Sequence, residues 1–265
     1  MAEIIGLCNQ KGGVGKTTSA INLAASLAAA EKHVLLVDFD PQSNSSSGLG
    51  IQKNSIESNS YRLVVDQSPA TPLAPQKTDL AYLDIIPAAT DLVGAEVELV
   101  SFEQREYALK KSLEPYHSQY DFILIDSPPS LGLLTLNLLV ASHYLLVPVQ
   151  AEYYALEGIS DLMRTVSLVQ QNLNPSLDVL GILITMHDAR NNLAHDVEHE
   201  LRAHFGDKVF RTVIPRNIRL SEAPSHGKPV LLYDIKSKGA ESYLQLAQEF
   251  LSRLEEKQQR LGSVA

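Results

Sequence analysis

The stretch "CNQKGGVGKTTSAINLAASLA", residues 8–28, decides the fold, because it puts a glycine-rich turn between an apolar run and a helical pattern. The preceding "EIIGLC" (residues 3–8) is apolar and β-branched, as a buried strand is. The turn contains three glycines, Gly12, Gly13 and Gly15. Glycines let successive backbone N–H groups point inward at phosphate oxygens. A helix beginning at about Lys16 adds the partial positive charge of its N-terminus. The stretch therefore predicts a phosphate-binding loop between a strand and a helix.

The loop departs from the common phosphate-loop pattern, because Gln10 stands where the first glycine is expected. The Gly-Lys-Thr end of that pattern is intact, so we expect Lys16 to reach the terminal phosphates of a nucleotide and the Thr17 hydroxyl to ligate Mg²⁺. A second lysine, Lys11, stands at the mouth of the loop and has no spare phosphate to hold in its own site. A solvated surface lysine is the alternative for Lys11. The nucleotide-binding residues that we expect are Lys11, Gly12, Gly13, Val14, Gly15, Lys16, Thr17 and Thr18.

Composition is that of an ordinary globular protein of 265 residues, with 45% hydrophobic and 20% charged residues. We expect a single domain over residues 1–265, although two domains are possible at this length. A single cysteine, Cys8, favours a reducing cytoplasm and no disulfide framework. The apolar strand pattern of residues 3–8 begins almost at the first residue, so we expect no signal segment. No apolar run is long enough to suggest a membrane helix.

Short apolar runs alternate with helical patterns along the chain, which indicates strand–helix–strand repetition. We expect strands in residues 3–8, 33–39, 83–88, 120–126, 143–149, 177–185 and 208–215, and helices in 16–30, 101–116 and 155–173. The fold class that this predicts is α/β, a single domain with a mostly parallel twisted sheet flanked by helices on both faces. Residues 51–81 lack periodicity and read as a surface excursion. Residues 241–260 carry one apolar stripe, as a C-terminal helix packed on the body does.

Three aspartates follow predicted strands. "LLVDFDPQ" ends a predicted strand with Asp38 and Asp40, and "FILIDSPPSLG" ends another with Asp126. Ligands of such sheets gather at the carboxyl ends of the strands, so the three acids are expected near the loop. A lone aspartate at a strand end is more often a cap or turn residue, but three beside a phosphate loop favour a magnesium–nucleotide site. In this site Asp126 is expected to orient a Mg²⁺-bound water.

Together these features resemble the ParA/Soj family of deviant-loop ATPases and their relative MinD. The resemblance covers most of the chain and rests on "KGGVGKTT", "VDFDPQ", "DSPPSLGLLTLN", "PVQAEYYALEG" and "VIPRNIRLSEAPSHGKPV". It implies an ATPase in which Lys16 holds its own ATP and Lys11 crosses to the phosphates of a second subunit. It implies that Asp40 positions the attacking water, that Asp38 lies near Mg²⁺, and that "SPPSLG" after Asp126 is a mobile segment that senses the γ-phosphate. The catalytic residues are then Lys11, Lys16 and Asp40, and the metal residues Thr17, Asp38 and Asp126.

The same resemblance assigns a base contact and a DNA-binding face. Pro215 and Asn217 match the adenine-contacting positions of the family, although proline and asparagine also build ordinary strand-to-helix turns. The net charge of −9 disfavours a globally basic surface, but basic residues slightly outnumber acidic ones between positions 186 and 240. Arg190 and Arg219 match the family's DNA-binding positions best. Further candidates are Arg216, Lys236 and Lys238, and solvated surface residues are the alternative for all five.

The family implies an ATP-dependent homodimer that binds double-stranded DNA without sequence preference, is associated with the nucleoid, and is stimulated to hydrolyse ATP by a ParB-type partner. A MinD-like membrane role would need a basic amphipathic tail, which "EEKQQRLGSVA" does not supply. An iron–sulfur carrier would need cluster cysteines, and Cys8 alone cannot serve. A partition repressor would need a DNA-reading domain ahead of the loop. A nonhydrolytic binding module is disfavoured by Asp40 together with Asp126.

Overall fold

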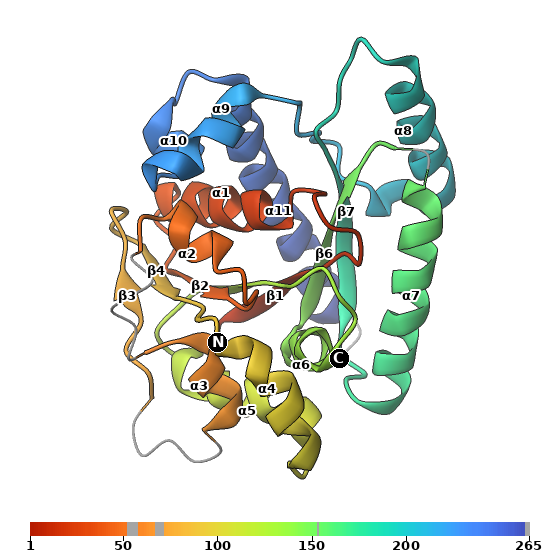
Figure 1. Ribbon diagram of the computed structural model, residues 1–265. Helices are drawn as coiled ribbons and strands as arrows, with labels where there is room; N and C mark the ends of the chain where they lie inside the picture. Colours follow the sequence, from red (N-terminus) through yellow and green to blue (C-terminus); the bar gives the residue numbers. More distant parts are fainter. Residues whose placement is uncertain (52–57, 67–71, 153, 263–265) are drawn as a thin grey trace.

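A seven-stranded sheet forms the centre of the molecule, in the order β3-β4-β2-β5-β1-β6-β7 (Figure 1). The computed structural model describes residues 1–51, 58–66, 72–152 and 154–262. Among the strands in these described ranges, only the short β3 runs antiparallel to its neighbour, and the other pairs are parallel. The central strands are buried from end to end, as expected for a parallel sheet covered on both sides. The strands are β1 (Glu3–Leu7), β2 (Val34–Asp38), β3 (Gln76–Lys77), β4 (Leu83–Ile86), β5 (Phe122–Asp126), β6 (Tyr144–Gln150) and β7 (Asp178–Thr185).

Helices cover both faces of the sheet, so the predicted single α/β domain with a mostly parallel sheet is confirmed. One apolar cluster joins the sheet to α3 (Ser60–Val65), α4 (Leu92–Glu98), α5 (Ala108–Leu113), α6 (Leu133–Ala141), α7 (Ala155–Asn172) and α8 (Asn192–Phe205). The other joins it to α1 (Lys16–Ala29), α9 (Ile218–Glu222), α10 (Val230–Tyr233) and α11 (Lys238–Gly262), with α2 (Asn44–Gly48) beside α1. None of the helices in the described ranges has both the length and the apolarity to cross a membrane.

Two of the expected elements differ in the structure. The strand expected over residues 208–215 makes only isolated bridges beside β7, because the Glu249 carboxylate accepts the N–H groups of Arg211 and Thr212, each at 2.8 Å. A side chain thus replaces the ladder partner that a regular strand would need. The helix expected over 101–116 is broken into 3-10 turns around α5, because Gln104 has a φ of 53° and Pro115 lacks an N–H.

The C-terminal helix α11 packs its apolar stripe on α1 and the sheet (Figure 1). The Phe250 ring meets Phe122 of β5 edge to face at 5.6 Å. The Tyr243 hydroxyl lies 3.1 Å from Ser19 Oγ of α1 and forms a buried hydrogen bond. The surface excursion expected at residues 51–81 falls partly outside the described residues, at 52–57 and 67–71; its described part includes α3 and β3.

Candidate functional site

The carboxyl ends of β1, β2 and β5 meet at one edge of the sheet. Leu7 and Asp38 both pair in register with Asp126, which lies on the strand between them. Residues 8–15 leave β1 at this edge and lead into α1. The sequence expectation that the phosphate loop and the strand-end aspartates lie together therefore agrees with the geometry.

Two glycines give the loop its shape. Gly13 and Gly15 have φ angles of 76° and 84°, in the left-handed region where a side chain strains the backbone. Gly15 is also the N-cap of α1, so the helix N-terminus opens directly onto the loop. A Cβ on Gly12 would lie 3.7 Å from Pro129 Cβ, which brings the "SPPSLG" segment against the loop.

Lys16 is buried inside the loop, with 6% of its surface exposed. Its Nζ donates hydrogen bonds to the carbonyl oxygens of Asn9 (3.0 Å) and Lys11 (3.3 Å). Burial lowers the pKa of Lys16, and the nearby Asp126 carboxylate opposes that change. A triphosphate would give this buried cation a stronger partner than two carbonyl groups do.

Lys11 lies at the rim of the loop and is bonded elsewhere. Its ammonium forms an ion pair with Glu152, which follows β6, and about half of each side chain is exposed. The Lys11 N–H donates to Asn9 Oδ1 at 3.0 Å, while Asn9 Nδ2 donates to Pro148 O at 2.8 Å, so Asn9 fixes the loop to β6. The two lysines therefore have separate environments, one inside the loop and one outside it.

Asp126 is fully buried beneath the loop. Ser45 Oγ donates to its Oδ2 at 2.8 Å, whereas its Oδ1 accepts no hydrogen bond from the described part of the chain. Burial raises the pKa of Asp126 to about 7, the charge of Asp38 adds to the rise, and the Thr17 hydroxyl opposes it. A buried carboxylate oxygen without a donor, close to Thr17, suits a hydrated divalent cation.

Asp38 and Asp40 differ in their bonding. Asp38 Oδ2 accepts hydrogen bonds from Ser46 N (2.8 Å) and Ser46 Oγ (2.6 Å), which fix the carboxyl group; burial still raises its pKa to about 6. Asp40 Oδ1 accepts from Gln42 N at 3.0 Å. Burial raises the pKa of Asp40, and the Gln42 N–H and Lys16 oppose the rise. The raised pKa values of Asp38 on β2 and Asp126 on the adjacent β5 indicate a site that lacks compensating positive charge, which Mg²⁺ would supply.

The end of β7 forms a further wall of the loop. Thr185 Oγ1 donates toward Val14 O (2.8 Å) and Val149 O (3.1 Å), so β7 is tied to both the loop and β6. Two residues on, His187 bridges Pro215, and this places Pro215 on the same side of the molecule as the loop. Asn217 caps α9, because its side chain accepts the N–H of Arg219 at 2.9 Å. Cap formation leaves the amide N–H₂ of Asn217 for another acceptor.

The candidate DNA-binding residues form two exposed groups. Arg190 makes a two-pronged ion pair with Asp188, at 2.9 and 3.0 Å, and the field of Arg216 also lowers the pKa of Asp188. In the second group Arg219 pairs with Glu222 at 2.8 Å and with Asp234 at 3.2 Å. The remaining candidates are exposed: Lys236, and Lys238, which pairs with Glu241 at 3.2 Å.

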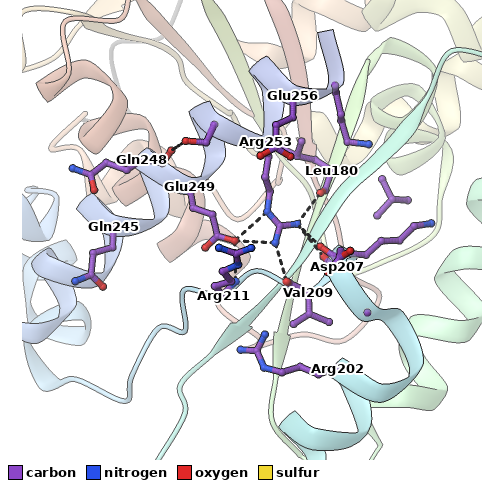
Figure 2. Close-up of a pocket in the computed structure, with 15 residues that line it drawn as sticks. Leu180, Arg202, Asp207, Val209, Arg211, Gln245, Gln248, Glu249, Arg253 and Glu256 are labelled. Carbon is purple, nitrogen blue, oxygen red and sulfur yellow. Dashed lines mark hydrogen bonds and ion pairs between the residues drawn. The ribbon is translucent and has the colours of Figure 1, made fainter. Parts of the chain in front are cut away.

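A large cavity lies away from the loop, between α11, the start of β7 and residues 206–211 (Figure 2). Its volume is about 940 Å³. Arg253 dominates its wall: the guanidinium donates to Glu249, to the carbonyls of Asp207 and Val209, and lies 4.0 Å from the centre of the Phe210 ring. With its donors paired, Arg253 holds residues 207–210 against α11 and serves the fold.

Sequence reasoning missed the residues that fix the site. Glu152 lies in the motif "PVQAEYYALEG", but nothing in that motif alone indicates an ion pair with Lys11. Ser45 and Ser46 lie in the serine run after Asp40, and a cluster of hydroxyls following a strand-end acid is the signal that could have found them. Thr185 is the last residue of the strand expected over residues 177–185, and nothing in the sequence indicates that its side chain contacts the loop.

Comparison with known proteins agrees with this geometry. An AAA domain model matches residues 2–179. The chain is 55% identical over 253 residues to the chromosome partitioning protein ParA of Myxococcus xanthus, covering 96% of this chain and 89% of that protein. It is 55% identical to the sporulation initiation inhibitor protein Soj of Bacillus subtilis, covering 94% and 98%. The structure of cobyrinic acid a,c-diamide synthase from Mycobacterium smegmatis, with bound ADP and magnesium, matches with a TM-score of 0.83 at 35% identity over 96% of each chain.

Proposed function

This chain belongs to the ParA/Soj family of chromosome-partitioning ATPases, and from that premise we propose that ATP switches it between a monomer and a DNA-binding dimer. In the proposed dimer two nucleotides are sandwiched between two copies of the chain. Hydrolysis of ATP to ADP and phosphate, stimulated by a ParB-type partner, separates the copies and releases DNA. The protein is then cytoplasmic and associated with the nucleoid.

The loop residues 11–18 hold the triphosphate in this proposal. The backbone N–H groups of the loop and the buried ammonium of Lys16 face the phosphate oxygens. Thr17, Asp38 and Asp126 hold Mg²⁺ and its water ligands, and the unbonded Oδ1 of Asp126 supports this assignment. The cation supplies charge that stabilises the phosphates during transfer to water. Pro215 and Asn217 contact the adenine, in keeping with their position beyond the end of β7.

Lys11 carries the coupling between ATP and dimerisation. The observation that carries the proposal is the separation of the two lysines: Lys16 is inside the loop, while Lys11 is on the exposed rim with Glu152. An exposed ion pair of this kind contributes only about 0–1 kcal/mol, so a triphosphate on a second copy competes easily for Lys11. Each copy then completes the charge around the other copy's nucleotide.

Asp40 positions the attacking water. Its carboxyl group is held by the Gln42 N–H next to Lys16, so its orientation is fixed before ATP is cleaved. A held carboxylate can accept a hydrogen bond from water in line with the γ-phosphate. Loss of that phosphate removes the group that Lys11 of the second copy contacts, and the dimer separates.

DNA binding follows from doubling a local basic face. A monomer of net charge −9 binds a polyanion poorly, but a dimer presents two sets of the exposed residues Arg190, Arg216, Arg219, Lys236 and Lys238. Phosphate contacts add, and each contact that is made releases a counterion. Affinity for nonspecific duplex DNA is therefore expected to depend on ATP and to fall steeply with salt.

The test is sedimentation with ATP, with ADP and without nucleotide, each with and without nonspecific duplex DNA. Lys11→Ala should bind ATP with about the wild-type affinity but remain monomeric and off DNA. Lys110→Ala, an exposed lysine on α5, is the matched control and should behave as wild type. A folded wild-type chain that stays monomeric when saturated with a nonhydrolysable ATP analogue contradicts the proposal.

The DNA face has its own test. Arg219→Glu should dimerise with ATP and hydrolyse it at its basal rate, yet lose retention on DNA at moderate salt. Arg164→Glu changes an exposed arginine on α7 by the same charge and should leave retention unchanged. Equal losses in the two variants would mean that net charge governs binding, with no local face.

A further inference from the structure

Two histidines and a glutamate converge between the end of β7 and α8, just beyond Thr185, whose side chain contacts the nucleotide loop. His187 follows β7, while His195 and Glu198 lie three residues apart on α8. One potential ligand atom from each of these residues lies within 4.8 Å of the others. We propose that His187, His195 and Glu198 bind a divalent transition-metal ion of the Zn²⁺ class.

The bonding of His187 points to a missing ligand. Its side chain is nine-tenths buried, and its Nε2 lies 3.1 Å from Glu198 Oε2. The pair does not have the orientation of a hydrogen bond, so this buried nitrogen has no hydrogen-bond partner among the described residues, and Glu198 is its only ion-pair contact there. A buried imidazole nitrogen without a hydrogen bond is unfavourable, and a cation bound both to it and to the facing carboxylate oxygen would satisfy the two groups together.

Hydrogen bonds of the other two side chains leave one possible ligand atom on each. His195 Nε2 lies 2.9 Å from Ala189 O, and because a carbonyl can only accept, Nε2 carries the proton and Nδ1 keeps its lone pair. Arg202 binds Glu198 Oε1 through two nitrogens, at 2.8 and 2.9 Å, which leaves Oε2 toward His187. In metal sites, hydrogen bonds of this kind fix the tautomer and the orientation of the side chains that bind the metal.

The donor set selects the class of ion. Two imidazoles and one carboxylate suit Zn²⁺, whereas Mg²⁺ and Ca²⁺ prefer all-oxygen sites. Tetrahedral zinc with bonds of about 2.0–2.1 Å holds its donor atoms about 3.4 Å apart, so the His187–Glu198 separation of 3.1 Å already fits. Cys8 does not compete, because burial raises the pKa of its thiol to about 11.

The site would brace a loop that other parts of the chain depend on. Met186 has a φ of 49°, a conformation that a methionine keeps only when its surroundings enforce it. The backbone of His187 accepts from Arg216 N (2.9 Å) and donates to Ile214 O (3.0 Å). A metal joining His187 to α8 therefore stiffens the turn between β7 and α8 together with residues 214–216.

The experiment uses the full chain without a histidine tag, stripped of metal and kept in excess Mg²⁺ without nucleotide. Titration calorimetry with Zn²⁺ should give one equivalent bound, and Co²⁺ should produce visible absorption bands of a low-symmetry four- or five-coordinate site. His195→Ala and Glu198→Gln should each weaken Zn²⁺ binding by more than about 100-fold. Loss of a residue that only hydrogen-bonds to a metal ligand already weakens metal binding by about 10–100-fold, and these two residues are proposed as ligands themselves. Zn²⁺ should raise the thermal midpoint of the wild type and of neither variant.

His199→Ala is the matched control, because His199 is exposed on the same helix and outside the cluster. It should retain the full equivalent of Zn²⁺ and the Co²⁺ bands. Absence of Zn²⁺ binding by the folded wild type would overturn the proposal. So would equal binding by wild type and His195→Ala, which would place the ion on other residues.

Discussion

Replacing Asp126 by asparagine tests the claim that this buried carboxyl group lacks a compensating positive charge when no nucleotide or metal is bound. Burial raises the pKa of Asp126 from its ordinary 3.8 to about 7 in the folded chain. Because the folded pKa is the higher one, the stability from this group is fully present below pH 3.8 and is lost as the pH rises through 7. The whole loss corresponds to about 4 kcal/mol, and about 2 kcal/mol of it falls between about pH 5.5 and about pH 8.5.

Asparagine has nearly the same shape and can still accept the hydrogen bond from Ser45 Oγ, but it does not ionise. We therefore expect the free energy of unfolding of Asp126→Asn, relative to wild type, to rise by about 2 kcal/mol from about pH 5.5 to about pH 8.5. Urea denaturation at both pH values, with EDTA and without nucleotide, measures this difference. Asp161→Asn, at an exposed position on α7, is the control and should show no such rise.

Magnesium–ATP should reverse the order of the two proteins, because the charged carboxylate gains a cation that asparagine cannot use as well. A relative stability of Asp126→Asn that stays constant or falls with rising pH would refute the reasoning. It would mean that Asp126 ionises in the folded chain without penalty.

Three further perturbations follow from named contacts. Asp40→Ala should slow ATP hydrolysis by about 100-fold or more and accumulate as an ATP-bound dimer. Phosphate release measures the hydrolysis and sedimentation measures the dimer. Hydrolysis at the wild-type rate would contradict the role of Asp40 in positioning water. Glu152→Gln should free Lys11 and tighten ATP-dependent dimerisation by up to about fivefold, within the worth of an exposed ion pair; weaker dimers would contradict this. Gly181→Ala should lower stability by about 1–3 kcal/mol, because its Cβ would lie 2.6 Å from Phe210 Cε2 and 2.8 Å from Lys208 O. Gly158→Ala, with open space around it, should not lower the thermal midpoint, and equal losses would argue against a clash.

The fold was predictable because its strands are buried on both faces and read as continuous apolar runs. β1, β2, β4, β5 and β7 fall within the expected ranges, and β6 ends one residue beyond its expected range. The expectation over 208–215 was wrong because its apolar residues indicate a strand, while the partner of its N–H groups, Glu249, is distant in sequence. A single sequence carries no signal for that kind of pairing.

The convergence of the candidate site residues was predictable from the sequence, whereas their hydrogen bonds and ion pairs were less so. The glycines and the strand-end aspartates follow from local spacing, since parallel strands bring their carboxyl ends together. The partner of Lys11 could not be foreseen, because it depends on how the chain leaves β6, and an exposed glutamate has no pattern that marks it. The cluster of His187, His195 and Glu198 likewise depends on how α8 docks beside β7.

The pairing of Arg253 with residues 207–210 has a consequence for how the protein is made. The ribosome produces the phosphate loop well before α11, yet α11 supplies the clamp on the segment that leads to Pro215. A nascent or truncated chain that ends before Glu249 carries every loop glycine and all three aspartates but lacks this anchor. The segment that leads to Pro215, the proposed base contact, is thus clamped only after α11 has been synthesised, so a chain interrupted before Glu249 would present this segment without its anchor.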